Sequence, residues 1–252
     1  LLITGCNSDT QVMERPEKVY YDTAQRRMKA NNFFSAIESL QAIEARYPFG
    51  RYAEQAQSEL IYAYYMNGED EASHEAAEKF IRLNPRHPNI DYAYFMRGIA
   101  SYTRDKGVFA RVFKSDLSNR DISGAKQAFG ELSEFLTRFP QSQYAPYASQ
   151  RLIYLRSLIA KNELVAAEYY LKRKAYVAAL RRAKYVIENI PNTSENIRAL
   201  QIVRECYEAL GYFELMEDIE KVIEVNGGSI IENSESASWN FFSRKAPRPA
   251  QD

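Results

Sequence analysis

The chain has few of the residues that build covalent or metal-based frameworks. Its 252 residues include two cysteines, two histidines and one tryptophan. Two cysteines cannot form the disulfide framework that holds many small secreted domains together, so packed apolar side chains must stabilise this fold. Cys206 lies in an amphipathic run, and we expect it to be a small apolar filler of the core rather than a nucleophile.

Long apolar runs and an excess of one charge are also missing. No run approaches the roughly 18 apolar residues that a membrane-spanning helix needs. The 33 basic residues equal the 33 acidic residues in number, which gives no reason to expect a nucleic acid as a partner. A chain of this length can bury one extensive core or several small cores in series.

Motifs for catalysis are hard to find. The sequence has no glycine-rich phosphate loop, nucleophile elbow or zinc signature. His74 stands beside acidic residues on an expected helix and is interpreted as part of a solvated face, whereas His87 lies in a turn stiffened by two prolines. Because nothing in their spacing makes the histidines converge with carboxylates, we expect no metal site and no cofactor. The sequence therefore favours a non-enzymatic protein.

Small, aromatic and proline residues recur with a fixed spacing. Four times a small residue is followed 12 positions later by proline, and the fourth and seventh residues after the small one are apolar or small. This pattern predicts a helix with an apolar stripe that ends before the proline, which cannot continue the hydrogen-bond ladder. The pairs are Ala36 with Pro48, Ser73 with Pro85, Ala128 with Pro140 and Ala179 with Pro191. A second set of small residues comes before three of them: Ala24, Gly98 and Ala167.

This joint spacing resembles the tetratricopeptide repeat, a helix-turn-helix unit of about 34 residues. The resemblance implies an all-α superhelical solenoid of about five repeats. The fifth, degenerate repeat is expected to have a helix at about 195–210, a turn at Gly211 and a helix at about 212–225. Terminal repeats of such arrays deviate because one of their faces meets solvent.

The repeat spacing changes at two places. About 18 residues are inserted between Gly98 and Ala128, at about 104–122, and this basic amphipathic stretch either contacts a lipid or partner or folds back onto its own repeat. An extra helix at about 144–159 links the third and fourth repeats and is expected to join the residues after it in one long helix. We therefore predict an N-terminal module (17–143), a C-terminal module (144–225) and a largely disordered tail (226–252). The aromatic cluster at 239–242 either docks on a partner or on the body, or has no role.

The first residues have the form of a bacterial lipobox. Ile3, Thr4 and Gly5 place an apolar and two small residues before Cys6, which is the pattern that receives a diacylglycerol thioether and an N-acyl chain. We expect 1–5 to be the remnant of a signal peptide and 6–16 to be a lipidated tether. Asn7 after the cysteine favours the outer membrane, with the body facing the periplasm. The alternative is a chance tetrapeptide.

Several longer strings resemble the BamD family of outer-membrane assembly lipoproteins. The resemblance runs from about residue 20 to about residue 223, although the inserted loop and the long tail depart from the family pattern. The strings are RYPFGRY (46–52), LIYAYY (60–65), FIRLNPRHPNIDYAY (80–94), RFPQSQYA (138–145), AEYY (167–170) and AYVAA (175–179).

The resemblance implies a scaffold in the complex that folds and inserts β-barrel proteins into the outer membrane. Its N-terminal repeats would offer a groove to the accessory lipoproteins BamC and BamE and to the substrate's C-terminal targeting strand. We expect five residues to mark this groove and its rim: Tyr62, Tyr64, Tyr65, Arg82 and Asn84. Tyr62 and Tyr65 share a helix face and Tyr64 turns away, and about half of these tyrosines are expected to pack between helices instead.

By family position, the C-terminal repeats would bind the periplasmic domain of the barrel subunit BamA. The expected contact residues are Arg173, Tyr176, Arg181 and Arg182. Arg182 flanks a seam of small residues, where its guanidinium could pair with a partner carboxylate without contributing to thermal stability. The alternative is a solvated basic face. A competing interpretation of the whole chain is a generic peptide-binding or pilus-related repeat lipoprotein of the cell envelope.

Overall fold

A computed structural model of the chain describes residues 15–104, 122–227 and 248–249. In these ranges all regular structure is α-helical, as the sequence predicted. Each described helix is too short or too polar to cross a lipid bilayer. The helices are α1 (Glu17–Lys29), α2 (Phe33–Arg46), α3 (Ala53–Asn67), α4 (Asp70–Leu83), α5 (Ile90–Arg104), α7 (Ser123–Arg138), α8 (Ala145–Lys172), α9 (Tyr176–Asn189), α10 (Glu195–Leu210) and α11 (Phe213–Gly227).

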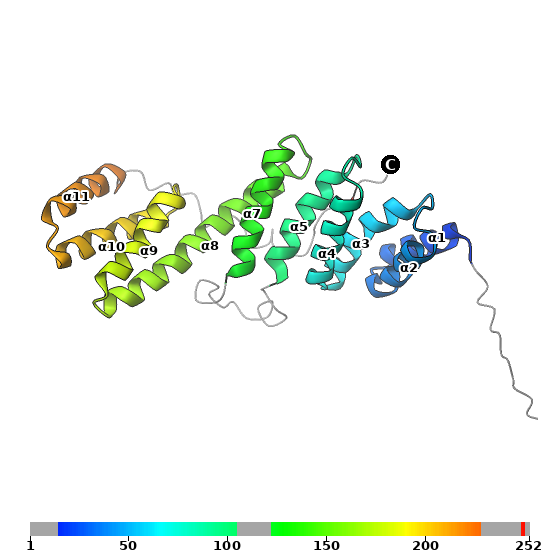
Figure 1. The fold of residues 1–252 in the computed structure, drawn as a ribbon, viewed down its shortest axis with the longest axis horizontal. Helices are drawn as coiled ribbons and strands as arrows, with labels where there is room; N and C mark the ends of the chain where they lie inside the picture. The colour runs from blue at the N-terminus through cyan, green and yellow to red at the C-terminus, as the bar shows by residue number, and fades with distance from the viewer. Residues whose placement is uncertain (1–14, 105–121, 228–247, 250–252) are drawn as a thin grey trace, which may run out of the picture.

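The helices stack as antiparallel pairs in an elongated array (Figure 1). The pairs α1/α2, α3/α4, α5/α7, α8/α9 and α10/α11 follow one another along the long axis, with α1 and α2 at one end and α11 at the other. Each helix packs mainly on its neighbours in sequence. This arrangement confirms the predicted tetratricopeptide-type solenoid of five helix pairs in the described residues.

The small residues of the repeat pattern lie where neighbouring helices meet. All four residues that start the windows, and Ala24 and Ala167 before them, are fully buried. Gly98 in α5 is packed so closely that an added Cβ would lie 2.6 Å from Cδ2 of Leu132 in α7. The apolar positions that follow are buried as well, with 0–1% exposure: Leu40, Ile43, Ala77, Phe80, Leu132, Phe135, Ala183 and Val186.

The four prolines end four helices in the same way. Each second helix of a pair ends two residues before its proline, and the residue between them leaves the helical region. That residue has φ between −123° and −130° and ψ between 54° and 57° in all four cases. The cause is steric, because the proline ring disfavours the α conformation in the residue before it.

The turns inside the pairs use left-handed residues. Gly68 between α3 and α4 and Gly211 between α10 and α11 have positive φ, as do Asn31 between α1 and α2 and Lys174 between α8 and α9. Such a residue lets the cap N–H groups bond to the last carbonyls of the helix and reverses the chain within a few residues. The predicted turn at Gly211 is therefore confirmed.

Helix α8 runs for 28 residues without interruption, so the predicted fusion of the linking helix with the residues after it is confirmed. Its buried residues join a hydrophobic cluster that extends from Ile61 to Cys206, and a second cluster holds α1, α2 and part of α3. The larger cluster crosses residue 143, and the division into two modules there stays a prediction. Cys206 is fully buried, and burial raises the pKa of its thiol to about 11, as expected of an apolar filler.

Candidate functional site

Helix α3 directs its tyrosines to different surroundings. Tyr65 is 3% exposed and belongs to the large core cluster. A ring buried to this extent offers no contact area, so its assignment to the groove is corrected here. Tyr62 is half-buried and meets the ring of Phe33 edge to face, with 5.9 Å between the ring centroids. Tyr64 is half-buried on another side of α3, where its hydroxyl accepts a hydrogen bond of 2.7 Å from Gln41 Nε2.

Tyr64 lines a cavity of about 180 Å³ between α2, α3 and α4. Inside it, Lys79 Nζ lies 2.6 Å from Glu44 Oε1. Asn84 reaches the edge of this cavity, because its amide donates a hydrogen bond of 2.9 Å to Gln57 Oε1, and Gln57 is one of the lining residues. Arg82 is exposed. The lining residues are Glu44, Gln57, Leu60, Tyr64, Ala72, Glu75, Ala76, Lys79 and Phe80.

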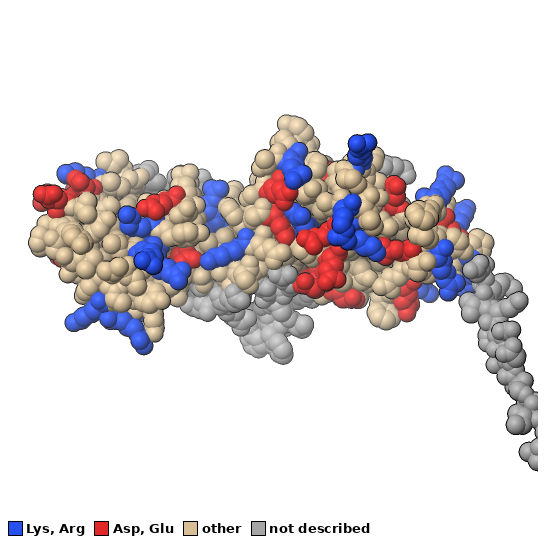
Figure 2. Space-filling view, viewed as in Figure 1, with Lys and Arg blue, Asp and Glu red and all other residues tan. Residues whose placement is uncertain are grey.

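The expected barrel-subunit contact lies at the turn between α8 and α9. Lys172 ends α8 and Arg173 and Lys174 form the turn, and Figure 2 shows Lys and Arg side chains gathered at this corner of the molecule. The guanidinium carbon of Arg173 lies 4.7 Å from the centroid of the Tyr169 ring, and both residues are exposed. The pair presents a flat, partly apolar surface with a positive charge above it.

Helix α9 starts at Tyr176, which is half-buried, and the neighbouring Val177 is exposed. Arg181 is exposed on the same helix. These residues and the Arg173–Tyr169 pair are the candidate contact residues of this region, called together below the α8–α9 surface.

Arg182 has a partner within the chain. Its Nη1 lies 2.7 Å from Oε2 of Glu163 in α8, and Lys126 Nζ from α7 lies 2.9 Å from Oε1 of the same carboxylate. The Glu163 side chain is 5% exposed and that of Arg182 is 47% exposed. Burial by itself would raise the pKa of the Glu163 carboxyl, but the hydrogen bonds from Lys126 and Arg182 outweigh it and hold the pKa below its usual value.

The Arg182 contact bears on two expectations. The guanidinium has a buried carboxylate of its own chain as its partner, so a role in binding a partner's carboxylate stays a prediction. We now expect its replacement to affect thermal stability, because a buried charge that loses one of two cations is destabilised. The sequence pattern correctly placed Arg182 beside the seam, but it did not reveal Glu163 on the other side.

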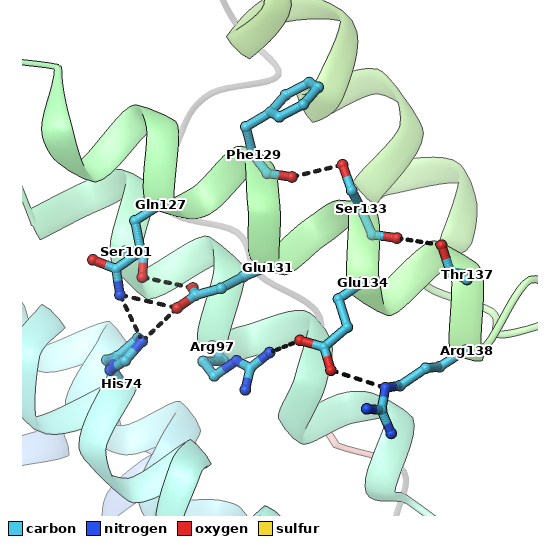
Figure 3. A network of polar contacts seen from close by, with 10 residues as sticks. All are labelled: His74, Arg97, Ser101, Gln127, Phe129, Glu131, Ser133, Glu134, Thr137 and Arg138. Atoms are coloured by element: carbon cyan, nitrogen blue, oxygen red, sulfur yellow. Dashed lines mark hydrogen bonds and ion pairs between the residues drawn. The ribbon is translucent and has the colours of Figure 1, made fainter.

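A polar network joins α4, α5 and α7 in the middle of the array (Figure 3). Glu131 accepts hydrogen bonds from Ser101 Oγ at 2.7 Å and Gln127 Nε2 at 2.9 Å, and His74 Nε2 lies 2.9 Å from its Oε1. His74 is buried. The interpretation of His74 as part of a solvated face was wrong, because α7 from a distant part of the sequence covers that face of α4.

Protonation of the two central groups is coupled by this contact. The hydrogen bond to Glu131 raises the pKa of His74, although burial opposes the shift. Burial would raise the pKa of Glu131, but the bonds from His74, Ser101 and Gln127 lower it. The contact therefore favours the charged form of both groups, and it lies in the seam between three helices.

The same figure shows a second, more exposed chain of charges along α5 and α7. Arg97 Nη2 lies 2.6 Å from Glu134 Oε2, and Arg138 Nε lies 2.8 Å from Glu134 Oε1. Both guanidinium groups also approach the Tyr94 ring, at 5.1 and 5.2 Å from its centroid. Figure 2 shows acidic side chains gathered over this middle part of the face in view.

Some predicted features lie outside the described residues. They are Cys6 with its lipobox, nearly all of the insertion at about 104–122, and the aromatic cluster at 239–242. In the described ranges no three His, Cys, Asp or Glu side chains come together in a way that could hold a metal ion. The sequence reasoning missed the buried carboxylates of Glu59 and Glu163 and the largely buried one of Glu131, all of which pair with residues far away in the sequence.

A known family matches the chain over most of its length. The family model described as YfiO, outer membrane lipoprotein, matches residues 13–222. The outer membrane protein assembly factor BamD of Vibrio cholerae is 34% identical over 226 residues, which cover 89% of this chain and 94% of that protein. The factor of the same name from Neisseria meningitidis is 36% identical over 210 residues, covering 83% and 78% of the two chains. That of Xylella fastidiosa is 35% identical over 229 residues, covering 90% and 78%.

Among solved structures, nearly identical TPR-like repeats from Podosopora anserina align with 84% of this chain and 96% of theirs, at 14% identity and a TM-score of 0.41. The family assignment depends on the sequence matches instead. Because the family model matches the array from α1 into α11, with the proline-terminated helices among the matched residues, the chain belongs to the YfiO family of outer membrane lipoproteins, which includes the assembly factor BamD.

Proposed function

We propose that the chain is a non-enzymatic scaffold of the machinery that assembles β-barrel proteins in the outer membrane. Relatives that are 34–36% identical to it over most of its length carry the name of an outer membrane protein assembly factor. The stacked helix pairs support the proposal because a solenoid offers a long surface to several partners at once. The polar groups gathered at Glu131 and Glu163 support it too, since they are engaged with one another in helix seams.

The proposal includes the membrane anchor. Cys6 would carry the diacylglycerol and N-acyl chains, and the repeat array would face the periplasm from the outer membrane. More than one acyl chain makes such an anchor stable, since each buried CH₂ contributes about 0.8 kcal/mol. The family description as an outer membrane lipoprotein supports this part.

The N-terminal repeats would bind BamC, BamE or extended substrate segments. The cavity between α2, α3 and α4 supports this assignment, because Tyr64, Ala72 and Ala76 give it apolar walls. The half-exposed Lys79, which pairs with Glu44 in the free chain, gives it a cation that a peptide carboxylate would share. An extended peptide ending in an aromatic residue and a carboxylate matches this combination. If the assignment holds, Lys79→Glu should reduce capture of such a peptide by the full chain at least fivefold. Lys29→Glu at the end of α1 is the matched control, and equal capture by both variants would contradict the assignment.

The C-terminal repeats would bind the periplasmic domain of BamA through the α8–α9 surface. The observation that carries this assignment is the exposed Arg173–Tyr169 pair in a Lys- and Arg-rich turn, because arginine and aromatic residues dominate the energetics of protein interfaces. Arg181 and Tyr176 extend the surface along α9. Arg182 is left out because it serves Glu163.

Titration of the purified periplasmic domain of BamA against the full chain tests this assignment. Arg173→Glu should weaken binding at least tenfold, about 1.4 kcal/mol, with an unchanged melting temperature. Lys221→Glu in α11 makes the same charge change at a residue whose side chain is 71% exposed, and it should bind like the wild type. Wild-type affinity of the Arg173 variant would move the contact elsewhere.

A further inference from the structure

A buried carboxylate lies between α1 and α3, on the side of α3 that carries Tyr62. The Glu59 side chain is 0% exposed. Its Oε2 accepts a hydrogen bond of 2.5 Å from Gln25 Nε2, and its Oε1 accepts longer ones from Gln55 Nε2 at 3.3 Å and the Tyr21 hydroxyl at 3.4 Å. A carboxylate removed from water in this way calls for a cation.

The cation comes from the other end of the chain. Nη2 of Arg248, which follows Glu59 by 189 positions, lies 3.3 Å from Glu59 Oε1. The same nitrogen donates a hydrogen bond of 2.6 Å to Gln25 Oε1 and lies 3.9 Å from the sulfur of Met28. Pro249, the next residue, is buried. Helix α11 ends at the opposite end of the array (Figure 1), so this contact closes the chain onto its first repeat.

The surroundings of Arg248 form a site that fits a guanidinium group. Gln25 is bonded through both ends of its amide, since the nitrogen donates to Glu59 and the oxygen accepts from Arg248. This orientation fixes where the cation lies. Tyr21 and Tyr52 stack beside the site, with 4.5 Å between their ring centroids. Tyr62 also lies near Arg248. Burial raises the pKa of its hydroxyl, and the positive charge of Arg248 offsets part of this shift.

We propose that the polar site formed by Glu59 and Gln25 between α1 and α3 binds an arginine-bearing extended segment, and that the chain's own Arg248–Pro249 segment occupies it in the free protein. Only one part of this proposal rests on the proposed function, namely that a partner of the N-terminal repeats also uses the site next to Tyr62. A segment that is part of the same chain competes with any free segment for the site. A partner segment that uses this site must therefore displace the tail, and its apparent affinity is its intrinsic affinity multiplied by the fraction of chains in the open state.

A labelled peptide of residues 244–252 (RKAPRPAQD) tests the proposal by fluorescence anisotropy with the full chain. The peptide should bind Arg248→Ala at least tenfold more tightly than wild type, because the competing arginine has been removed. Arg244→Ala is the matched control, with the same charge change in the same tail, and it should bind like wild type. Equal affinity of the three proteins, or failure of the peptide to bind Arg248→Ala, would overturn the proposal.

Two further arms define the chemistry of the site. A peptide with citrulline in place of Arg248 keeps the shape and loses the charge, and its affinity for Arg248→Ala should fall at least tenfold. The change Glu59→Gln in the Arg248→Ala background should likewise lower the affinity for the unmodified peptide at least tenfold. If that double variant does not fold, the citrulline peptide alone tests whether the site requires the charge. A dimer that forms in wild type and is lost in Arg248→Ala would overturn the intramolecular contact. No partner of the assembly machinery is present, so these results are independent of the proposed function.

Discussion

The pairing of Arg182 with Glu163 gives a stability prediction whose size follows from the structure. Arg182→Glu removes one of the two cations that contact a carboxylate exposed to only 5%, and places a second carboxylate near it. A hydrogen bond to a charged group contributes about 1.5–3 kcal/mol. Because the Arg182 side chain is 47% exposed, solvent screening reduces its share, and we assign about 1 kcal/mol to the loss of the guanidinium.

The introduced carboxylate adds repulsion to this loss. Two like charges 4 Å apart repel by about 4 kcal/mol at an effective dielectric constant near 20. The new side chain can turn toward solvent, and Lys126 still neutralises Glu163, so roughly 1–2 kcal/mol of the repulsion should remain. The total of about 2–3 kcal/mol corresponds to a fall in melting temperature of roughly 4–12 °C for a domain of this size.

Urea denaturation of four proteins measures this effect: wild type, Arg182→Ala, Arg182→Glu and the control Arg181→Glu. Arg182→Ala should lose about 1 kcal/mol, whereas the exposed Arg181 should cost at most about 0.5 kcal/mol. In the double variant Glu163→Gln with Arg182→Glu the repulsion is gone, so most of the loss should be recovered. If Arg182→Glu proves as stable as Arg181→Glu, the ion pair does not stabilise the fold and the reasoning fails.

Three other predictions concern the charged seam, the backbone and the anchor. The hydrogen bond to Glu131 raises the pKa of His74, so the native state binds the proton more tightly than the unfolded state does. The resulting gain in free energy of unfolding is complete below about pH 6.5 and is lost as the pH rises through the folded pKa. Urea midpoints at pH 6 and pH 8.5 should show this loss in wild type but not in His74→Gln, and parallel pH profiles would contradict it. Gly211 has a φ of 78°, so Gly211→Ala should destabilise the fold by about 1 kcal/mol. At Gly130 an added Cβ meets nothing within 4 Å, so Gly130→Ala should stabilise α7 by about 0.5–1 kcal/mol. Equal melting temperatures of the two variants would refute the backbone argument. Cys6→Ser should abolish acyl labelling of the full-length protein in cells, and normal labelling would contradict the anchor.

Local rules explain why so much of the fold could be predicted. The end of a helix two residues before Pro48 follows from the proline ring alone, and the same holds at the three other prolines. The close approach of α5 to α7 at Gly98 required a residue without a side chain, and the spacing indicated that position. Because these effects act over a few residues, a single sequence is enough to reveal them.

The candidate sites were harder to predict because their partners come from distant repeats. Helical periodicity placed His74 on the polar face of α4, but only the packing of α7 makes that face an interior seam. In the same way, nothing near Glu59 in the sequence indicates that Arg248 approaches it. Tyr62 and Tyr65 share a helix face, yet they differ in burial because Tyr65 belongs to the core shared with the next helix pair and Tyr62 packs against Phe33 of α2.

The central claim is that this repeat array holds the barrel subunit through the α8–α9 surface. Photo-crosslinking in cells tests it most directly, with the photoreactive residue placed at Val177, which is 63% exposed at the start of α9. Val225 in α11 is 81% exposed and serves as the matched control. We expect a crosslink to BamA from position 177 and none from position 225. Absence of a BamA crosslink at 177 in a protein that still fractionates with the outer membrane would contradict the claim.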